Sequence, residues 1–229
     1  MSRSPLADRI RPKTLSEFFG QEHLVGKRGI IRKLIESDQL PSMIFWGPPG
    51  SGKTTLAYVI ANTTKSHFFH YSAVATTLDD VRKVVKEAKE RKEAYNQKTI
   101  FFLDEIHRFN KAQQDAFLPH VEKGTITLIG ATTENPSFEV IGPLLSRCRV
   151  FVLNRLENDE LSKIIERGIK ELKIKIKDDA LGFLIQASNG DARIALNALE
   201  IADSLIASHR SPITLKLIQE VFQKKSLLY

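Results

Sequence analysis

The chain has 229 residues, of which 42% are hydrophobic and 27% charged, and its 34 Lys and Arg against 27 Asp and Glu give a net charge of +7. This length and composition exclude a disulfide-stapled mini-protein and a disordered tail, because such a chain can bury a sizeable core. The single cysteine, Cys148, cannot form an intramolecular disulfide, and the first residues lack the apolar run of a signal peptide. No apolar run approaches the roughly 18 residues that cross a bilayer, so we expect a cytoplasmic protein that is not integral to a membrane.

Short apolar runs rich in β-branched and aromatic residues predict five strands, at residues 43–46, 68–73, 99–103, 125–131 and 149–153. Between the second and third runs, Val81, Val84, Val85 and Ala88 recur at helical spacing among charged residues and predict an amphipathic surface helix. This alternation is typical of an α/β domain with a parallel sheet and helices on both faces, which we place at residues 1–153.

After residue 153, helical periodicity replaces the strand signals and predicts a small all-helical domain at residues 154–229. We expect Asn158 and Asp191 to be the N-caps of two of its helices, and Gly190 to close the helix before Asp191.

The sequence GPPGSGKTT directly follows the first predicted strand and precedes a helical pattern. It fits the pattern G-x-x-x-x-G-K-[ST], whose glycines let backbone N–H groups turn toward a polyphosphate at the start of a helix. Lys53 would supply a charge for the β- and γ-phosphates, and the Thr54 hydroxyl is placed to bind Mg²⁺. The alternative is a glycine-rich turn with a surface lysine, but the order strand, loop, helix favours nucleotide binding. The nucleotide-binding residues predicted here are Gly47, Pro48, Pro49, Gly50, Ser51, Gly52, Lys53, Thr54 and Thr55.

Two acids, Asp104 and Glu105, end the apolar run at residues 99–103. Ligands of open α/β sheets lie beyond the carboxyl ends of the strands, so we expect both acids to face the phosphate loop. Asp104 would hold Mg²⁺ through its water shell, and Glu105 would orient and deprotonate the attacking water. The alternative is that two acids simply leave a strand into solvent. For His107 we favour a structural or coupling role over catalysis, because Glu105 already supplies a base.

The run DEIHRFNK at residues 104–111, its continuation AQQDAFLPHVEKGTITLIGATTENPSFEV, and the later LLSRCRV closely resemble the AAA+ ATPases of the replication-associated recombination protein A family. Their eukaryotic relative is the Werner-helicase-interacting ATPase. The resemblance runs from Pro5 to about Tyr229 and is most specific between Trp46 and Val152. It implies a five-stranded P-loop domain followed by a helical lid, ATP and Mg²⁺ as cofactors, and a DNA-dependent ATPase of replication-fork maintenance, recombination and repair.

The resemblance also implies roles that spacing does not show. Thr133 resembles the sensor 1 residue that helps position the attacking water, with Asn135 as the competing assignment. Arg147 resembles the arginine finger that reaches the γ-phosphate in a neighbouring subunit, and Arg193 resembles sensor 2, which projects over the phosphates. Residues 7–21 resemble the stretch that packs around adenine. Without the resemblance, each arginine would be an ordinary surface residue.

The implied partners are DNA junctions or forks, single-stranded-DNA-binding protein, other replisome components and further copies of the chain, in a nucleoid-associated cytoplasmic location. Family members continue into a C-terminal tetramerisation domain, and we expect this chain to stop before it and to hydrolyse ATP weakly when no neighbour supplies an arginine. Three alternatives stay open: a clamp-loader subunit, a branch-migration motor, and an ATP-gated binding module with little hydrolysis, against which Glu105 argues. The cations of the predicted helix, including Lys83, Lys86, Lys89 and Arg91, are a candidate DNA contact, although such runs are usually solvated faces.

Overall fold

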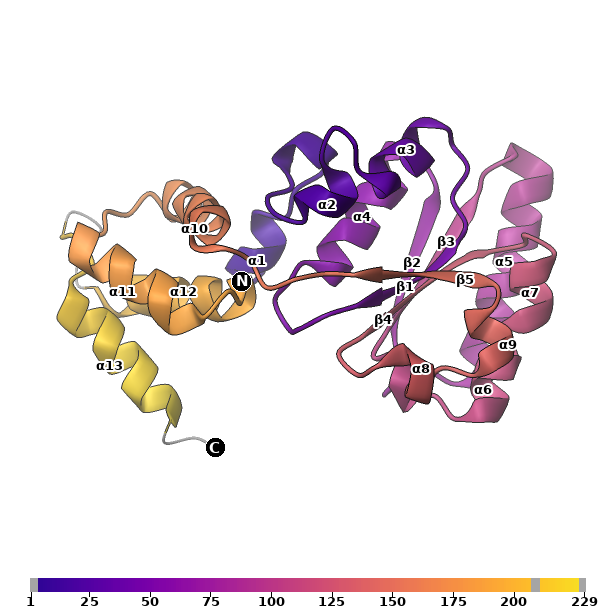
Figure 1. Ribbon diagram of the computed structural model, residues 1–229. Helices are drawn as coiled ribbons and strands as arrows, with labels where there is room; N and C mark the ends of the chain where they lie inside the picture. Colours follow the sequence, from indigo (N-terminus) through magenta and orange to yellow (C-terminus); the bar gives the residue numbers. More distant parts are fainter. Residues whose placement is uncertain (1–3, 207–210, 227–229) are drawn as a thin grey trace. The chain divides into compact units, whose positions relative to one another are not determined.

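The computed structural model describes residues 4–206 and 211–226 (Figure 1). Contacts divide the chain into two compact units, which we describe separately. The sheet unit comprises Pro12–Pro48 and Gly52–Asn154, and the helical unit comprises residues 155–226 with Pro49–Ser51 and residues 4–11. Along the chain, the change from sheet to helical unit lies one residue after the expected position.

A single parallel sheet forms the centre of the sheet unit. Its strands lie in the order β2-β3-β4-β1-β5, and all neighbouring pairs are parallel. The strands are β1 (Ser42–Trp46), β2 (His67–Ser72), β3 (Thr99–Asp104), β4 (Thr127–Thr132) and β5 (Cys148–Val152). Each strand overlaps one of the five predicted runs, so the predicted parallel α/β sheet is confirmed.

Helices cover both faces of this sheet, which is why the interior residues of β1 and β3 are apolar (Figure 1). Phe45 and Phe102 lie in the core on one face, whereas Phe101 and Leu103 lie in the core on the other. The first core includes residues of α2 (Glu22–Val25), α3 (Ile30–Glu36) and α4 (Lys53–Thr63). The second includes residues of α5 (Leu78–Tyr95), η2 (Ile106–Arg108) and α9 (Gly142–Leu145), with α7 (Leu118–Glu122) packed against it. The remaining short elements are η1 (Leu15–Glu17), α6 (Lys111–Asp115) and α8 (Pro136–Glu139).

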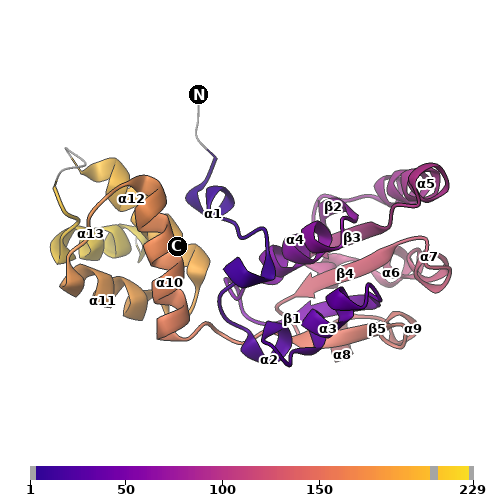
Figure 2. The same ribbon diagram turned by 90° about the horizontal axis from the view of Figure 1, so that it is seen from above.

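Within its described residues, the helical unit contains α1 (Leu6–Arg9), α10 (Asn158–Leu172), α11 (Asp178–Ser188), α12 (Ala192–Leu205) and α13 (Leu215–Ser226). Figure 2 shows α10 to α13 grouped together. Residues 4–11 belong here and not to the sheet unit in which the sequence placed them. The reason is that Leu6 is fully buried in the helical core and its backbone N–H donates to Glu200 Oε1 at 3.1 Å.

The helix ends of this unit confirm one expected N-cap and correct the other. Asp191 caps α12, because its Oδ1 accepts from two backbone N–H groups of the first turn, at 2.8 and 3.0 Å. Asn158, in contrast, is the first residue of α10, and Glu157 occupies the N-cap position. The N–H of Glu157 donates to Glu160 Oε2 at 2.9 Å, so an acid in the first turn satisfies the free backbone group. Gly190 follows α11 with a φ of 74°, as expected for a residue that closes a helix. Among the residues that the structure describes, no helix has the length and apolarity to cross a membrane.

Candidate nucleotide-binding site

The glycine-rich loop joins β1 to α4 at the carboxyl end of the sheet, as the sequence predicts. Gly50 and Gly52 have φ values of 69° and 97°, a region that side chains disfavour, and Gly52 is the N-cap of α4. At Gly47, an added Cβ would lie 2.2 Å from the carbonyl oxygen of Leu153, so only glycine fits this close approach. Because the first N–H groups of α4 have no partner within the helix, the loop presents donors and a positive helix end to an anion.

Lys53, the first residue of α4, is only 9% exposed. Its ammonium group donates to the carbonyl oxygens of Gly47, at 2.7 Å, and Pro48, at 2.9 Å. These two acceptors are neutral, so they hold the side chain against the loop without cancelling its charge. A cation held in this way against a glycine-rich loop at a helix start suits a polyphosphate.

Asp104 and Thr54 bring two oxygen ligands together beside the loop. Thr54 Oγ1 donates to Asp104 Oδ2 at 3.5 Å, which connects the first turn of α4 to the end of β3. Mg²⁺ prefers oxygen ligands and usually binds one or two protein groups together with phosphates and water. Among the described residues, no group of three or more His, Cys, Asp or Glu forms a metal cage of its own. The pair therefore fits a magnesium ion that a nucleotide would help to hold.

Glu105 follows Asp104 in a left-handed conformation, with a φ of 56° that few residues other than glycine adopt. Its N–H donates to Asp104 Oδ1 at 3.1 Å. Its side chain is 39% exposed, and Oε2 lies 3.2 Å from His107 Nε2. The other imidazole nitrogen of His107 lies 3.0 Å from Thr132 Oγ1. Sequence reasoning missed Thr132, although its polar side chain at the end of a central strand was a usable signal.

Thr133 and Asn135 follow β4, and both are half-buried. The carbonyl oxygen of Thr133 accepts from Trp46 Nε1 at 3.3 Å, which ties the turn after β4 to the last residue of β1. The side-chain oxygen of Asn135 caps α8 by accepting from the N–H of Ser137 at 3.0 Å. That contact leaves the amide N–H groups of Asn135 as donors, so both residues stay candidates for the sensor 1 role.

Arg147 lies on the surface between α9 and β5, and its side chain is 38% exposed. Its guanidinium contacts Glu122 Oε1 at 2.5 Å, the Pro143 carbonyl at 2.7 Å and Ser146 Oγ at 3.1 Å. Sequence reasoning missed Glu122, which lies 25 residues before Arg147 and carries no motif of its own. Burial raises the pKa of the neighbouring Cys148 to about 12, so this thiol stays protonated and is a poor nucleophile.

Arg193 belongs to the helical unit, where it is exposed in the first turn of α12. The structure joins Thr54 to Asp104 by one contact, with Glu105 next along the chain, and the role of Arg193 stays a prediction. The segment at residues 7–21 is divided, because its first residues belong to the helical unit and the rest to the sheet unit.

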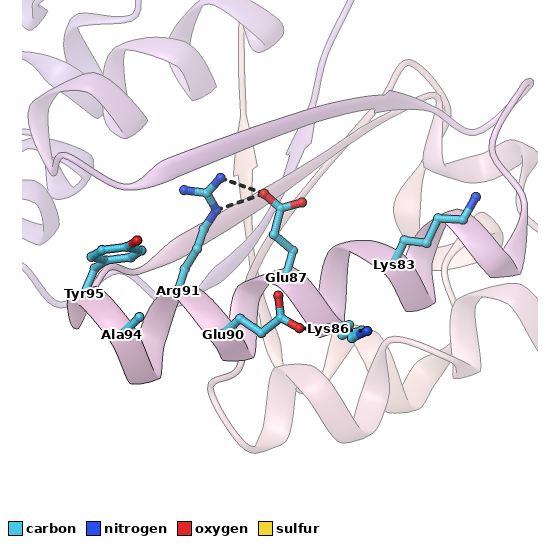
Figure 3. A pocket seen from close by; sticks show the side chains of 7 residues that line it. All are labelled: Lys83, Lys86, Glu87, Glu90, Arg91, Ala94 and Tyr95. Carbon is cyan, nitrogen blue, oxygen red and sulfur yellow. Dashed lines mark hydrogen bonds and ion pairs between the residues drawn. The ribbon is translucent and has the colours of Figure 1, made fainter.

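The exposed face of α5 is the candidate DNA contact raised by the sequence. Glu87 Oε1 accepts from Arg91 Nη2 at 2.6 Å and Nε at 3.0 Å, and Lys86 pairs with Glu90 at 3.9 Å (Figure 3). The depression on this face is lined by Lys83, Lys86, Glu87, Glu90, Arg91, Ala94 and Tyr95. Acids thus neutralise most of its cations, which favours an ordinary solvated face over a phosphate-binding one.

Residues 43–156 match the model of the ATPase family associated with various cellular activities (AAA), and residues 170–229 match the AAA C-terminal domain. The chain is 52% identical to the replication-associated recombination protein A of Coxiella burnetii, over 86% of this chain and 46% of that protein. It is 44% identical to the ATPase WRNIP1 of Dictyostelium discoideum, over 88% of this chain and 24% of that protein. The chain thus spans less than half the length of these two relatives.

A solved structure of Thermotoga maritima RuvB, described as a Holliday junction branch migration motor, has a similar fold. The TM-score is 0.77 and the identity 27%, over 94% of this chain and 72% of that chain. The likeness extends over both the parallel sheet and the helical region.

Proposed function

The chain belongs to the AAA ATPases of the replication-associated recombination protein A family, and on this premise we propose that it is a DNA-dependent ATPase that acts in replication-fork maintenance, recombination and repair. The observation that carries the proposal is the contact of Thr54 with Asp104, next to Glu105 and the buried ammonium of Lys53. The greater identity to the recombination protein than to the branch-migration motor favours the fork-related activity.

Each residue of the loop and of the end of β3 has a part in this proposal. Backbone N–H groups from Gly50 to Thr55 and the charge of Lys53 bind and orient the phosphates of ATP. Thr54 and Asp104 hold Mg²⁺, which when bound neutralises charge on the phosphate oxygens. Glu105 orients a water molecule in line with the γ-phosphate and accepts its proton, and Thr133 helps to position that water.

Two arginines complete the proposed machinery. Arg147 acts as a finger on the nucleotide of a neighbouring copy, because its guanidinium is exposed and can stabilise charge on the transferring phosphoryl group. Arg193, exposed at the start of α12, contacts the phosphates from the helical unit, which we assign as the lid at residues 154–229. Assembly of copies is then required for fast turnover, so an isolated chain hydrolyses ATP slowly.

The proposed partners are forks or junctions of single- and double-stranded DNA, single-stranded-DNA-binding protein and other replisome components, in the nucleoid-associated cytoplasm. The net charge of +7 supports a polyanionic partner. The face of α5 does not support this part of the proposal, since its cations are largely paired with acids.

The test is steady-state ATP hydrolysis with forked DNA, with linear duplex DNA and without DNA. We expect forked DNA to raise the turnover and the increase to weaken with added salt, because phosphate contacts release counterions. A protein that binds ATP but releases no phosphate beyond one turnover, with or without DNA, would be an ATP-gated binding module instead. Copurification with a sliding clamp would favour the clamp-loader alternative.

A further inference from the structure

We propose that His107 is a positioning residue, which fixes the carboxylate of Glu105 through a chain of hydrogen bonds anchored in the turn after β4. The proposal rests on the function proposed above, in which Glu105 accepts the proton of the attacking water. It adds two residues that the phosphate-binding motif does not contain, His107 and Thr132.

Three short contacts make up the chain. His107 Nε2 lies 3.2 Å from Glu105 Oε2, and His107 Nδ1 lies 3.0 Å from Thr132 Oγ1. Thr132 Oγ1 in turn accepts from the backbone N–H of Glu134 at 2.9 Å. Strand register explains the proximity, because Leu103 of β3 pairs with Gly130 of β4, so the segments that leave the two strands start side by side.

Every contact of this series can be a hydrogen bond. The Glu134 N–H donates to Thr132 Oγ1, and His107 Nε2–H donates to Glu105 Oε2. The Thr132 hydroxyl lies 3.0 Å from His107 Nδ1 and 3.3 Å from the Glu134 carbonyl oxygen, so the bond between Thr132 and the imidazole can run in either direction. The fixed backbone amide at the far end sets the orientation of the imidazole, as outer partners do for other functional histidines.

The hydrogen-bonded series is buried at the Thr132 end and exposed to solvent at the Glu105 end. Thr132 is fully buried and the His107 side chain is 9% exposed, whereas the Glu105 side chain is 39% exposed. The contact with His107 involves Oε2, which leaves Oε1 available to a water molecule. A glutamate side chain otherwise samples several rotamers, and holding it in one of them removes an entropic cost from the reaction.

The same series of hydrogen bonds spans Thr133. Since the Thr132 hydroxyl bonds to the N–H of Glu134, these two residues form a hydrogen-bonded turn with Thr133 at its centre. A shift of this turn would move the imidazole and with it the carboxylate of Glu105. His107 thereby links the proposed base to the proposed sensor residue.

Paired substitutions separate this role from a packing role. His107→Gln keeps a donor where Nε2 stands, whereas His107→Asn places its amide near Nδ1 and loses the contact with Glu105. Thr132→Ser keeps the hydroxyl, whereas Thr132→Val keeps the size and loses it. We expect His107→Asn and Thr132→Val to lower kcat by about 10-fold or more, and the other two variants by less than about threefold, with KM for ATP unchanged.

Nitrogen-15 NMR of the His107 imidazole reports directly on its two hydrogen bonds. The His107 signals are assigned as those that disappear from the spectrum of His107→Gln. We expect Glu105→Gln to shift the Nε2 signal, Thr132→Val to shift the Nδ1 signal, and Thr132→Ser to leave both near the native positions. This readout needs no turnover, so it tests the chain even if Glu105→Gln hydrolyses ATP normally and the proposed function fails. Unshifted imidazole signals in both Glu105→Gln and Thr132→Val, or native kcat in folded Thr132→Val, would overturn the proposal.

Discussion

Replacing Lys53 with Met removes the charge of the phosphate loop while keeping a side chain of similar length. Two unit charges 4 Å apart interact by about 4 kcal/mol at an effective dielectric constant of about 20. To reach a phosphate, however, the ammonium has to leave the carbonyl oxygens of Gly47 and Pro48, to which it donates at 2.7 and 2.9 Å. Hydrogen bonds from a charged donor contribute about 1.5–3 kcal/mol, so losing them offsets part of the gain and the net loss on substitution is about 1–2.5 kcal/mol. We therefore expect Lys53→Met to weaken ATP binding by roughly 5- to 70-fold.

Trp46 supplies the assay, because it is the sole tryptophan and directly precedes Gly47 at the start of the loop. Titration with Mg-ATP while following its fluorescence gives the dissociation constant, and calorimetry checks the value. Lys98→Met is the matched control, since Lys98 is half-exposed and pairs with Asp38 at 2.6 Å. If Lys53→Met bound ATP within about twofold of the native protein, the assignment of Lys53 to the phosphates would be refuted.

Three further predictions concern stability, measured by urea unfolding. Glu122→Gln breaks the ion pair with Arg147, but both side chains are more than a third exposed, so we expect a loss below about 1 kcal/mol; a larger loss would contradict a surface pair. Asp191→Ala removes the cap of α12 and should cost about 1–2 kcal/mol, whereas Asp191→Asn should retain most of the stability; equal losses would argue against capping. Burial, helped by two nearby lysines, lowers the pKa of His120, so the folded state binds fewer protons than the unfolded state below the ordinary value of 6.5. The free energy of unfolding should therefore fall as the pH decreases through 6.5 toward the lowered pKa, and His120→Gln should lessen this fall; an unchanged pH dependence would contradict it.

The strands were predictable because burial on both faces of a parallel sheet leaves uninterrupted apolar runs, as at residues 99–103. The assignment of residues 4–11 to the helical unit was not predictable, because the contact of Leu6 with Glu200 joins positions 194 residues apart. The N-cap of α10 was misplaced by one residue because Asn158 has the stronger intrinsic preference, whereas the carboxylate of Glu160 satisfies the N–H of Glu157.

In the site, the motif predicted Lys53, Thr54 and Asp104, because phosphate and magnesium chemistry fixes those residue types at that spacing. The partner of His107 could not be predicted in this way. Its contact with Thr132 depends on the register between β3 and β4, which the apolar runs do not specify. Glu122 could not be predicted either, because its contact with Arg147 depends on the packing between short helices.

The central assignment is Glu105 as the base that activates water at the phosphate loop. Its most direct test is the turnover of Glu105→Gln at saturating Mg-ATP, with the dissociation constant measured on the same protein by Trp46 fluorescence. We predict that kcat falls by about 10²- to 10⁴-fold while ATP still binds with native affinity, because the carboxylate acts on water and not on the phosphates. Native turnover by a variant that binds ATP normally would contradict the account.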